Sequence, residues 1–208
     1  MAPNDTAADP ITIGGKVFAV VDYHVSALDQ VTVTLRDDAH VIATGTTAAD
    51  GSFAITTASG GRALDAYLVV DDGVHRPTYA MSGAPLDGTQ DALIIVADDA
   101  ELARWYTDAG DSWDASKRTL VAAVTDCQPK STAASITASP APAHVVYYDP
   151  VAQRWDKTLT SSANGFVILT GADASETITA HAGGATFPSH AFATKPGAIV
   201  LAVVPPTT

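Results

Sequence analysis

Histidine and tyrosine are the side chains on which a metal-dependent enzymatic site in this chain would depend. The six histidines are scattered singly, and no His-x-His pair occurs. The densest grouping is His144 followed by Tyr147 and Tyr148. Because successive residues of a strand point to opposite faces of a sheet, only one of these tyrosines could share a site with His144. A metal site that draws on His144, Tyr147 or His190 is therefore an open alternative, and ordinary strand aromatics are the favoured interpretation.

Nucleophilic and nucleotide chemistry have weaker support. The chain has no Gly-x-Ser-x-Gly motif, no Walker loop and no Gly-x-Gly-x-x-Gly segment. Its only cysteine, Cys127, follows Asp126, and an acidic neighbour raises the pKa of a thiol and makes it less reactive. We interpret Cys127 as a passive free thiol and expect no catalytic residue in this chain.

Three aspartates form the best candidate metal site. Asp108, Asp111 and Asp114 recur at every third position, and carboxylate oxygens are the hard ligands that Ca²⁺ prefers. The spacing is not that of an EF-hand loop and no bidentate glutamate follows, so a solvated acidic linker is the competing and favoured interpretation. The sequence thus offers calcium as its one candidate metal and predicts no other cofactor.

Tyr147 and Trp155 are the candidate ligand-binding residues. They flank a polar turn, and exposed aromatic rings can stack on sugars or fill a pocket of a partner protein. The simpler interpretation, which we favour, is that the two rings pair across neighbouring strands and stabilise a hairpin.

Short strands position these residues, because apolar and polar residues alternate along much of the chain. Val31, Val33 and Leu35 alternate with polar residues, a period of two that gives one buried face. Similar runs recur between clusters of Gly, Asp, Asn and Pro, which is typical of a sandwich or barrel. Between two such runs, Asp50-Gly51 predicts a tight β-hairpin with a type I′ turn.

One segment, residues 98–109, has helical spacing instead. Asp98 and Glu101 form a capping box at its start, and Gly110 follows its end in the position of a C-terminal cap. The segment is predicted to be a short helix between two halves of the chain. Three of its large side chains share one face: Leu102, Trp105 and Tyr106.

The strand pattern after this helix repeats the pattern before it in the same order. Loop lengths differ between the two halves, but the order of the matching runs does not change. The sequence therefore predicts an internal duplication of a unit of roughly 85 residues. The clearest matches are residues 16–21 with 119–124, residues 31–35 with 135–138, and Asp50-Gly51 with Asn164-Gly165.

Each unit resembles the carboxypeptidase regulatory-like domain, a transthyretin-like (prealbumin-type) β-sandwich. The resemblance rests on residues 46–53 and on their weaker counterpart at residues 160–166. It implies an all-β fold of two tandem transthyretin-like sandwiches joined by a short helix. The predicted organisation is a tail (residues 1–11), a first sandwich (12–97), a helical connector (98–117) and a second sandwich (118–208).

This resemblance implies little about function, because such domains serve as spacers, adhesion modules and accessory domains. Related sandwiches include iron-dependent intradiol dioxygenases. They also include collagen-adhesin B-type domains, which join a first-strand Lys to a last-strand Asn or Asp beside a buried Glu. Lys16 and Asp98 lie at suitable strands, but no Glu lies between them; Glu176 lies near a suitable strand of the second unit, where residues 119–123 contain no Lys. We expect Lys16 to be a solvated lysine.

Composition and charge limit the partners and the location. The 208 residues include 23 acidic and 11 basic side chains, a net charge of -12 that repels phosphate backbones and argues against nucleic-acid binding. No apolar run has the length of a transmembrane helix. Scarce lysine and abundant aspartate favour an extracellular or cell-envelope location, and the first residues resemble a linker rather than a signal peptide.

The sequence therefore predicts a non-catalytic, exported β-sandwich module that meets a protein or glycan partner, mediates adhesion or spaces other domains. Two alternatives stay open. One is a small metal-dependent, dioxygenase-like enzyme on the same sandwich. The other is a structural component that self-associates through exposed strand edges.

Overall fold

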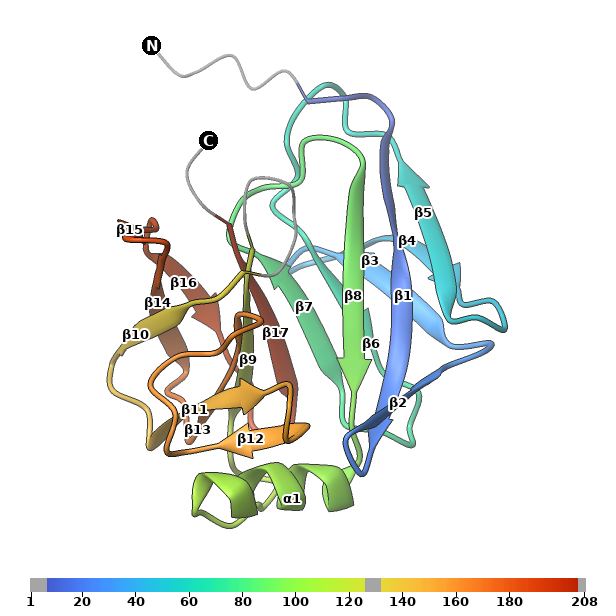
Figure 1. The fold of residues 1–208 in the computed structure, drawn as a ribbon. Coiled ribbons are helices and arrows are strands. Elements are labelled where there is room, and N and C mark those ends of the chain that lie inside the picture. Colours follow the sequence, from blue (N-terminus) through green and yellow to red (C-terminus); the bar gives the residue numbers. More distant parts are fainter. Residues whose placement is uncertain (1–6, 126–131, 206–208) are drawn as a thin grey trace.

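The computed structural model describes residues 7–125 and 132–205, and this part of the chain is all-β with one short helix (Figure 1). The predicted all-β class is confirmed. In chain order, the elements are β1 (Ile11–Val21), β2 (His24–Ala27), β3 (Thr32–Arg36), β4 (Val41–Thr46), β5 (Ser52–Thr57), β6 (Tyr67–Val70), β7 (Thr78–Ser82), β8 (Gln90–Val96), α1 (Asp99–Ala109), β9 (Thr119–Val124), β10 (Ser135–Ser139), β11 (His144–Asp149), β12 (Arg154–Asp156), β13 (Phe166–Thr170), β14 (Ser175–Ala182), β15 (Ala185–Thr186), β16 (His190–Ala193) and β17 (Ile199–Val204).

Within the described residues the strands form three sheets. In the first small sheet, β1 pairs with β2 and β5 in antiparallel fashion and with β8 in parallel. In the second, β14 pairs with β10, β15 and β16. The remaining strands form one continuous nine-stranded sheet in the order β12-β11-β13-β9-β17-β7-β6-β3-β4.

The last strand, β17, joins the two parts of the nine-stranded sheet. It lies between β9, which follows the helix, and β7, which precedes it, and it is parallel to both. Its side chains are buried on both faces, as expected for a central parallel strand. Backbone hydrogen bonds therefore tie the two halves of the chain together across β17.

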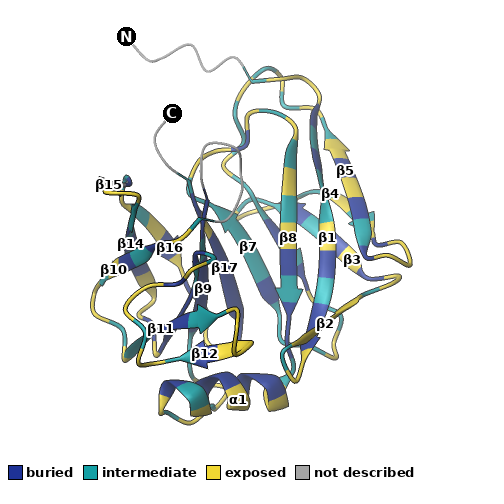
Figure 2. Ribbon diagram, viewed as in Figure 1, coloured by how far each residue is buried: buried dark blue, intermediate teal, exposed yellow. Residues whose placement is uncertain are grey.

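Alternate residues of the nine-stranded sheet belong to two different apolar cores. Figure 2 shows where the buried residues lie along the strands. Leu120 and Val167 point toward the second small sheet, whereas Val121 and Ile168 point to the other face. There they pack with α1 and with the first small sheet, so the first core continues across both halves of the chain.

The helix α1 begins and ends where the sequence predicts. Asp98 is the N-cap and accepts a hydrogen bond from the Glu101 amide at 2.8 Å, while Gly110 ends the helix with a φ of 83°. The capping box is only half formed, because the Glu101 side chain accepts hydrogen bonds from other groups. The predicted apolar face is buried and comprises Leu102, Trp105 and Tyr106. The described part of the chain contains no helix long and apolar enough to cross a membrane.

The predicted hairpin at Asp50-Gly51 is wrong. β4 and β5 do not pair with each other: β4 pairs with β3 in the nine-stranded sheet and β5 with β1 in the first small sheet. The turn therefore carries the chain from one sheet to the other, and of the two residues only Gly51 has a positive φ, of 76°. The turn signal was correct, but a turn does not specify which strands it joins.

Candidate functional site: an apolar cleft between two sheets

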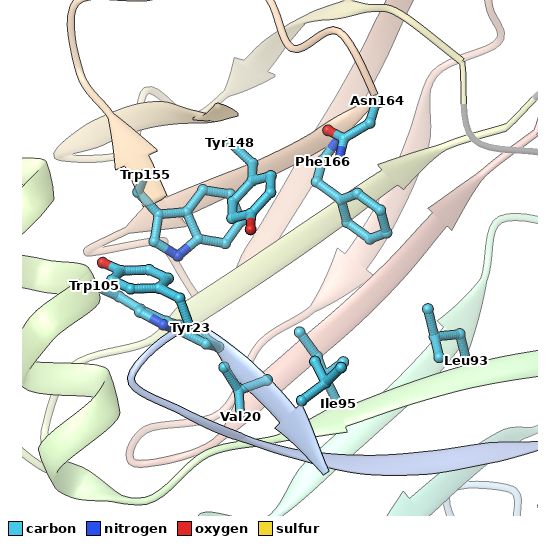
Figure 3. Close-up of a pocket in the computed structure, with 10 residues that line it drawn as sticks. Val20, Tyr23, Leu93, Ile95, Trp105, Tyr148, Trp155, Asn164 and Phe166 are labelled. Atoms are coloured by element: carbon cyan, nitrogen blue, oxygen red, sulfur yellow. The ribbon is translucent and has the colours of Figure 1, made fainter. Parts of the chain in front are cut away.

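An apolar cleft of about 250 Å³ opens between the first small sheet and the nine-stranded sheet (Figure 3). One wall comes from β1 and β8, the other from β11 to β13, and α1 closes one end. The two walls are lined by Val20, Leu93 and Ile95 on one side and by Tyr148, Trp155 and Phe166 on the other.

Trp155 lies at the centre of an aromatic cluster in this cleft. Its ring is 5.4 Å from that of Tyr148 and 5.9 Å from that of Trp105, measured between centroids, and both contacts are edge-to-face. Trp105 is on α1, so the cluster joins the helix to the nine-stranded sheet. Edge-to-face pairs of this kind add stability beyond the apolar area that they bury.

The candidate residues Tyr147 and Trp155 do not come together. Trp155 pairs across the strands with Tyr148, so the predicted Tyr147–Trp155 pair is wrong. Tyr147 points to the opposite face, into the second core, where its hydroxyl lies 3.2 Å from the Ile136 amide. Trp155 therefore lines the cleft and Tyr147 does not. The sequence shows that two adjacent tyrosines of a strand face opposite sides of the sheet. It does not show which of the two faces Trp155.

Glu101 lies beside the cleft, in contact with the lining residues Trp105 and Tyr23, and the sequence predicted only its part in the capping of α1. Its carboxylate is buried and accepts hydrogen bonds from the Trp105 indole at 2.7 Å and from the Asp22 amide at 2.7 Å. The Tyr23 amide and the Arg104 guanidinium are further donors, at 3.3 and 3.2 Å. The two turn amides fix α1 to the turn between β1 and β2, and the other two donors belong to α1 itself.

That turn contains two non-glycine residues with positive φ, Asp22 at 53° and Tyr23 at 61°. Both values are those of a type I′ hairpin, which usually requires Gly or Asn. The hydrogen bonds from both amides to Glu101 favour this conformation. The Tyr23 hydroxyl also donates a hydrogen bond to Asp108, and burial, reinforced by that carboxylate, raises the pKa of Tyr23 above its usual range.

The three aspartates of the predicted calcium site have separate partners. Asp108 accepts from Tyr23, while Asp111 forms an ion pair with Lys117 at 2.7 Å that holds the pKa of Asp111 below its usual value. Asp114 accepts from the amide and the hydroxyl of Ser116. Among residues 7–125 and 132–205 no group of three or more potential ligands could hold a metal ion. The geometry of these residues therefore gives the calcium prediction no support.

The three residues of the alternative enzymatic site are also separated. His144 and Tyr147 are both on β11, but they are three positions apart and so face opposite sides of the sheet. His190 is on β16 in the second small sheet, where its ring lies against Gly83. Cys127 lies outside the described residues.

Lys16 and Asp98 do not meet. Lys16 is half-exposed and pairs with Asp50 at 3.0 Å, and Asp98 caps α1. This is the environment that the sequence predicts for Lys16, a solvated lysine.

Three polar groups of the cleft are engaged by the protein itself. The Trp105 indole donates to Glu101, the Tyr23 hydroxyl to Asp108, and the Asn164 carbonyl oxygen accepts from Ser162. What the cleft offers to a partner is therefore mainly apolar surface, suited to burying apolar side chains.

No protein-family profile and no curated protein sequence matches this chain. Solved structures give distant likenesses. The shaft pilin SpaA of Lactobacillus rhamnosus GG aligns over 96% of this chain and 98% of its own, with 12% identity and a TM-score of 0.27. A DUF3823 family protein of Parabacteroides merdae aligns over 91% and 98%, with 13% identity and a TM-score of 0.31. The minor pilin of Streptococcus agalactiae aligns over 95% and 98%, with 9% identity and a TM-score of 0.29. At these values the likeness carries no inference about function.

Proposed function

We propose that this protein is a non-catalytic structural module, exported to the cell envelope or the extracellular space, that holds two β-sandwich units in a fixed relation and presents a surface to a partner. The units are residues 12–97 and 118–208, with residues 98–117 as connector. The observation that supports the proposal best is the continuous nine-stranded sheet, in which β17 pairs with β9 of the second unit and β7 of the first.

Two further contacts support a fixed relation between the units. The apolar face of α1 is buried against the nine-stranded sheet, and Glu101 ties the helix to the turn of the first small sheet. Relative motion of the units would break backbone hydrogen bonds of a sheet and expose buried aromatic surface. Flexible domain pairs have small, polar interfaces instead.

Similar hydrogen bonds between the first strand and the glycine turn of each unit support the duplication, although Val17 and Val124 are not matched positions in the sequence. The Val17 amide donates to the Gly51 carbonyl at 3.0 Å, and the Val124 amide donates to the Gly165 carbonyl at 3.1 Å. Both glycines have positive φ, of 76° and 75°. Each unit thus has the same contact between its first strand and its glycine turn.

Unfolding with two probes tests the proposal. We expect the loss of β-structure, followed by far-ultraviolet circular dichroism, and the exposure of the tryptophan cluster, followed by fluorescence, to coincide in one urea transition. Two transitions with different midpoints would contradict a rigid module. Elemental analysis is the second test, because near-stoichiometric iron, copper or zinc in the purified protein would contradict the non-catalytic assignment.

A further inference from the structure

The strand β8 leaves one edge unpaired next to the cleft. Within the described residues it pairs only with β1, in parallel, from Gln90 to Val96. A Cβ on Gly15 would lie 2.1 Å from the Ala92 carbonyl oxygen, so that carbonyl faces β1. Since backbone groups alternate in direction along a strand, Asp91, Leu93 and Ile95 direct theirs to the open edge.

Two cavities lie along this edge of β8 and leave room for another chain segment. A second cavity, of about 470 Å³, is lined by the first half of β8 and by β7 and β17, and the aromatic cleft is lined by the second half. Leu93 lines both cavities and its side chain is 54% exposed, which is unusual for a leucine between two apolar walls. The two cavities therefore adjoin along β8. A strand of seven residues, about 23 Å long, matches this length.

The charged side chains that line this groove are all acidic. Asp87 and Asp91 are among the residues that line the second cavity, and no Lys or Arg lines either cavity in the described part of the chain. The whole chain has a net charge of -12. A second copy of this acidic chain would be repelled, whereas a segment with a basic side chain beside these two aspartates would be attracted.

We propose that the groove along β8 binds an extended peptide segment of a partner protein, which adds as a strand to the open edge of β8. The segment inserts apolar side chains between Leu93 and the Tyr148–Trp155–Phe166 wall and places a lysine or arginine beside Asp87 and Asp91. This is the strand-addition mode of recognition, in which backbone hydrogen bonds give affinity and side-chain pockets give specificity. The inference rests on the proposed function, because it names the partner of that module.

Three polar groups of the aromatic cleft are not available to a glycan. Sugar hydroxyls need free hydrogen-bonding side chains, and the hydroxyl of Tyr23, the indole of Trp105 and the carbonyl oxygen of Asn164 are already engaged. Among the described residues, the open edge of β8 carries unpaired backbone groups, which match another backbone.

A displayed library of random nine-residue peptides, selected against the purified full-length protein, tests this inference. We expect the enriched peptides to alternate apolar and polar residues and to carry a Lys or Arg near one end. Binding should be weaker at high salt. Amide hydrogen exchange in the bound state should slow along β8, because the new strand protects its edge.

Three variants locate the site. Leu93→Thr is expected to weaken binding of the selected peptides by about five- to tenfold, because a buried apolar contact is lost. Asp87→Asn together with Asp91→Asn should weaken binding of the peptides with a basic residue by about threefold and remove most of the salt dependence. Val151→Thr is the matched control, because Val151 is 91% exposed in the turn between β11 and β12, and it should bind as the unmodified chain does.

The outcomes separate the alternatives. No enrichment, enrichment of peptides without the alternating pattern, or equal binding by Leu93→Thr would overturn the inference. If the protein binds an immobilised glycan panel and Leu93→Thr abolishes this binding, the peptide inference is overturned and the groove binds a sugar. The proposed function fails by a different result, two separate unfolding transitions, so the two failures are distinguishable.

Discussion

Glu101 and Glu176 are the only glutamates in the chain, and both are buried. Glu101 has four hydrogen-bond donors around its carboxylate. One oxygen of Glu176 accepts from the Asp173 amide at 2.8 Å, and the other has no partner in the described residues. A buried carboxylate with few donors is costly to ionise, and burial accordingly raises the pKa of Glu176 above its usual value of 4.5.

This raised pKa has a consequence for stability. An acid whose pKa is higher in the folded state contributes stability below its unfolded pKa and loses it as the pH rises through the folded pKa. Glu176→Gln, which cannot ionise, should therefore gain stability relative to the unmodified chain between about pH 4 and about pH 7. The measurement is the free energy of unfolding in urea at several pH values.

The matched control is Asp71→Asn, because Asp71 is exposed. Its free energy of unfolding is measured over the same pH range. A Glu176→Gln difference that is flat or falls with rising pH would contradict the raised pKa. The aspartates with lowered pKa values, such as Asp99 beside Arg76, produce the opposite trend in every variant, so their contribution cancels in the difference.

At the scale of elements, the turns show that a local signal specifies a turn but not its partners. Asp50-Gly51 has the composition of a hairpin and joins two sheets. Asp22-Tyr23 has no hairpin composition and forms a tight hairpin, with Val21 opposite His24. Glu101, distant in sequence, supplies the hydrogen bonds that favour the second turn.

The glycine turns permit a prediction that separates the cost of an unfavourable backbone conformation from the cost of a steric clash. Gly51 and Gly60 both have positive φ, but a Cβ on Gly51 would lie 2.6 Å from the Val17 carbonyl oxygen, and one on Gly60 would meet nothing within 4 Å. Gly60→Ala should cost about 1 kcal/mol of folding free energy, from backbone conformation alone. Gly51→Ala should cost about 2–4 kcal/mol, because the backbone must also move. Urea denaturation of both variants measures the difference, and equal costs would show that the turn is not tightly packed on β1.

At the scale of the whole molecule, Trp105 is one of the side chains through which α1 contacts the nine-stranded sheet. It is 1% exposed, lies against Trp155 and donates to Glu101. Trp105→Ala should lower the free energy of unfolding by about 3–5 kcal/mol. With the helix loosened, we expect the circular dichroism and fluorescence transitions to separate.

Trp105→Phe is the companion variant. It keeps an aromatic ring in the cluster but removes the indole donor from Glu101, so its loss of stability should be smaller and the two transitions should still coincide. If Trp105→Ala instead unfolds in one transition with an unchanged midpoint, α1 does not couple the two units. Pairing of β17 with β7 would then be sufficient to hold them.

The sequence by itself determined the all-β class, most of the strands, and the helix with its caps. These features depend on alternation of apolar residues and on capping groups within a few positions of each other, which are local properties. It also named Trp155 as a candidate binding residue, and the structure places that residue in the cleft. The division into two tandem transthyretin-like units remains a prediction.

Only the tertiary structure decided which strands are neighbours. Strand pairing uses backbone groups that are the same in every strand, so side-chain alternation indicates a buried face but not the strand alongside. For that reason the sequence could not show that β17 would lie between β9 and β7, nor that β8 would leave an open edge. It could not show that Tyr148 rather than Tyr147 would face Trp155, because that depends on a register set by the whole sheet.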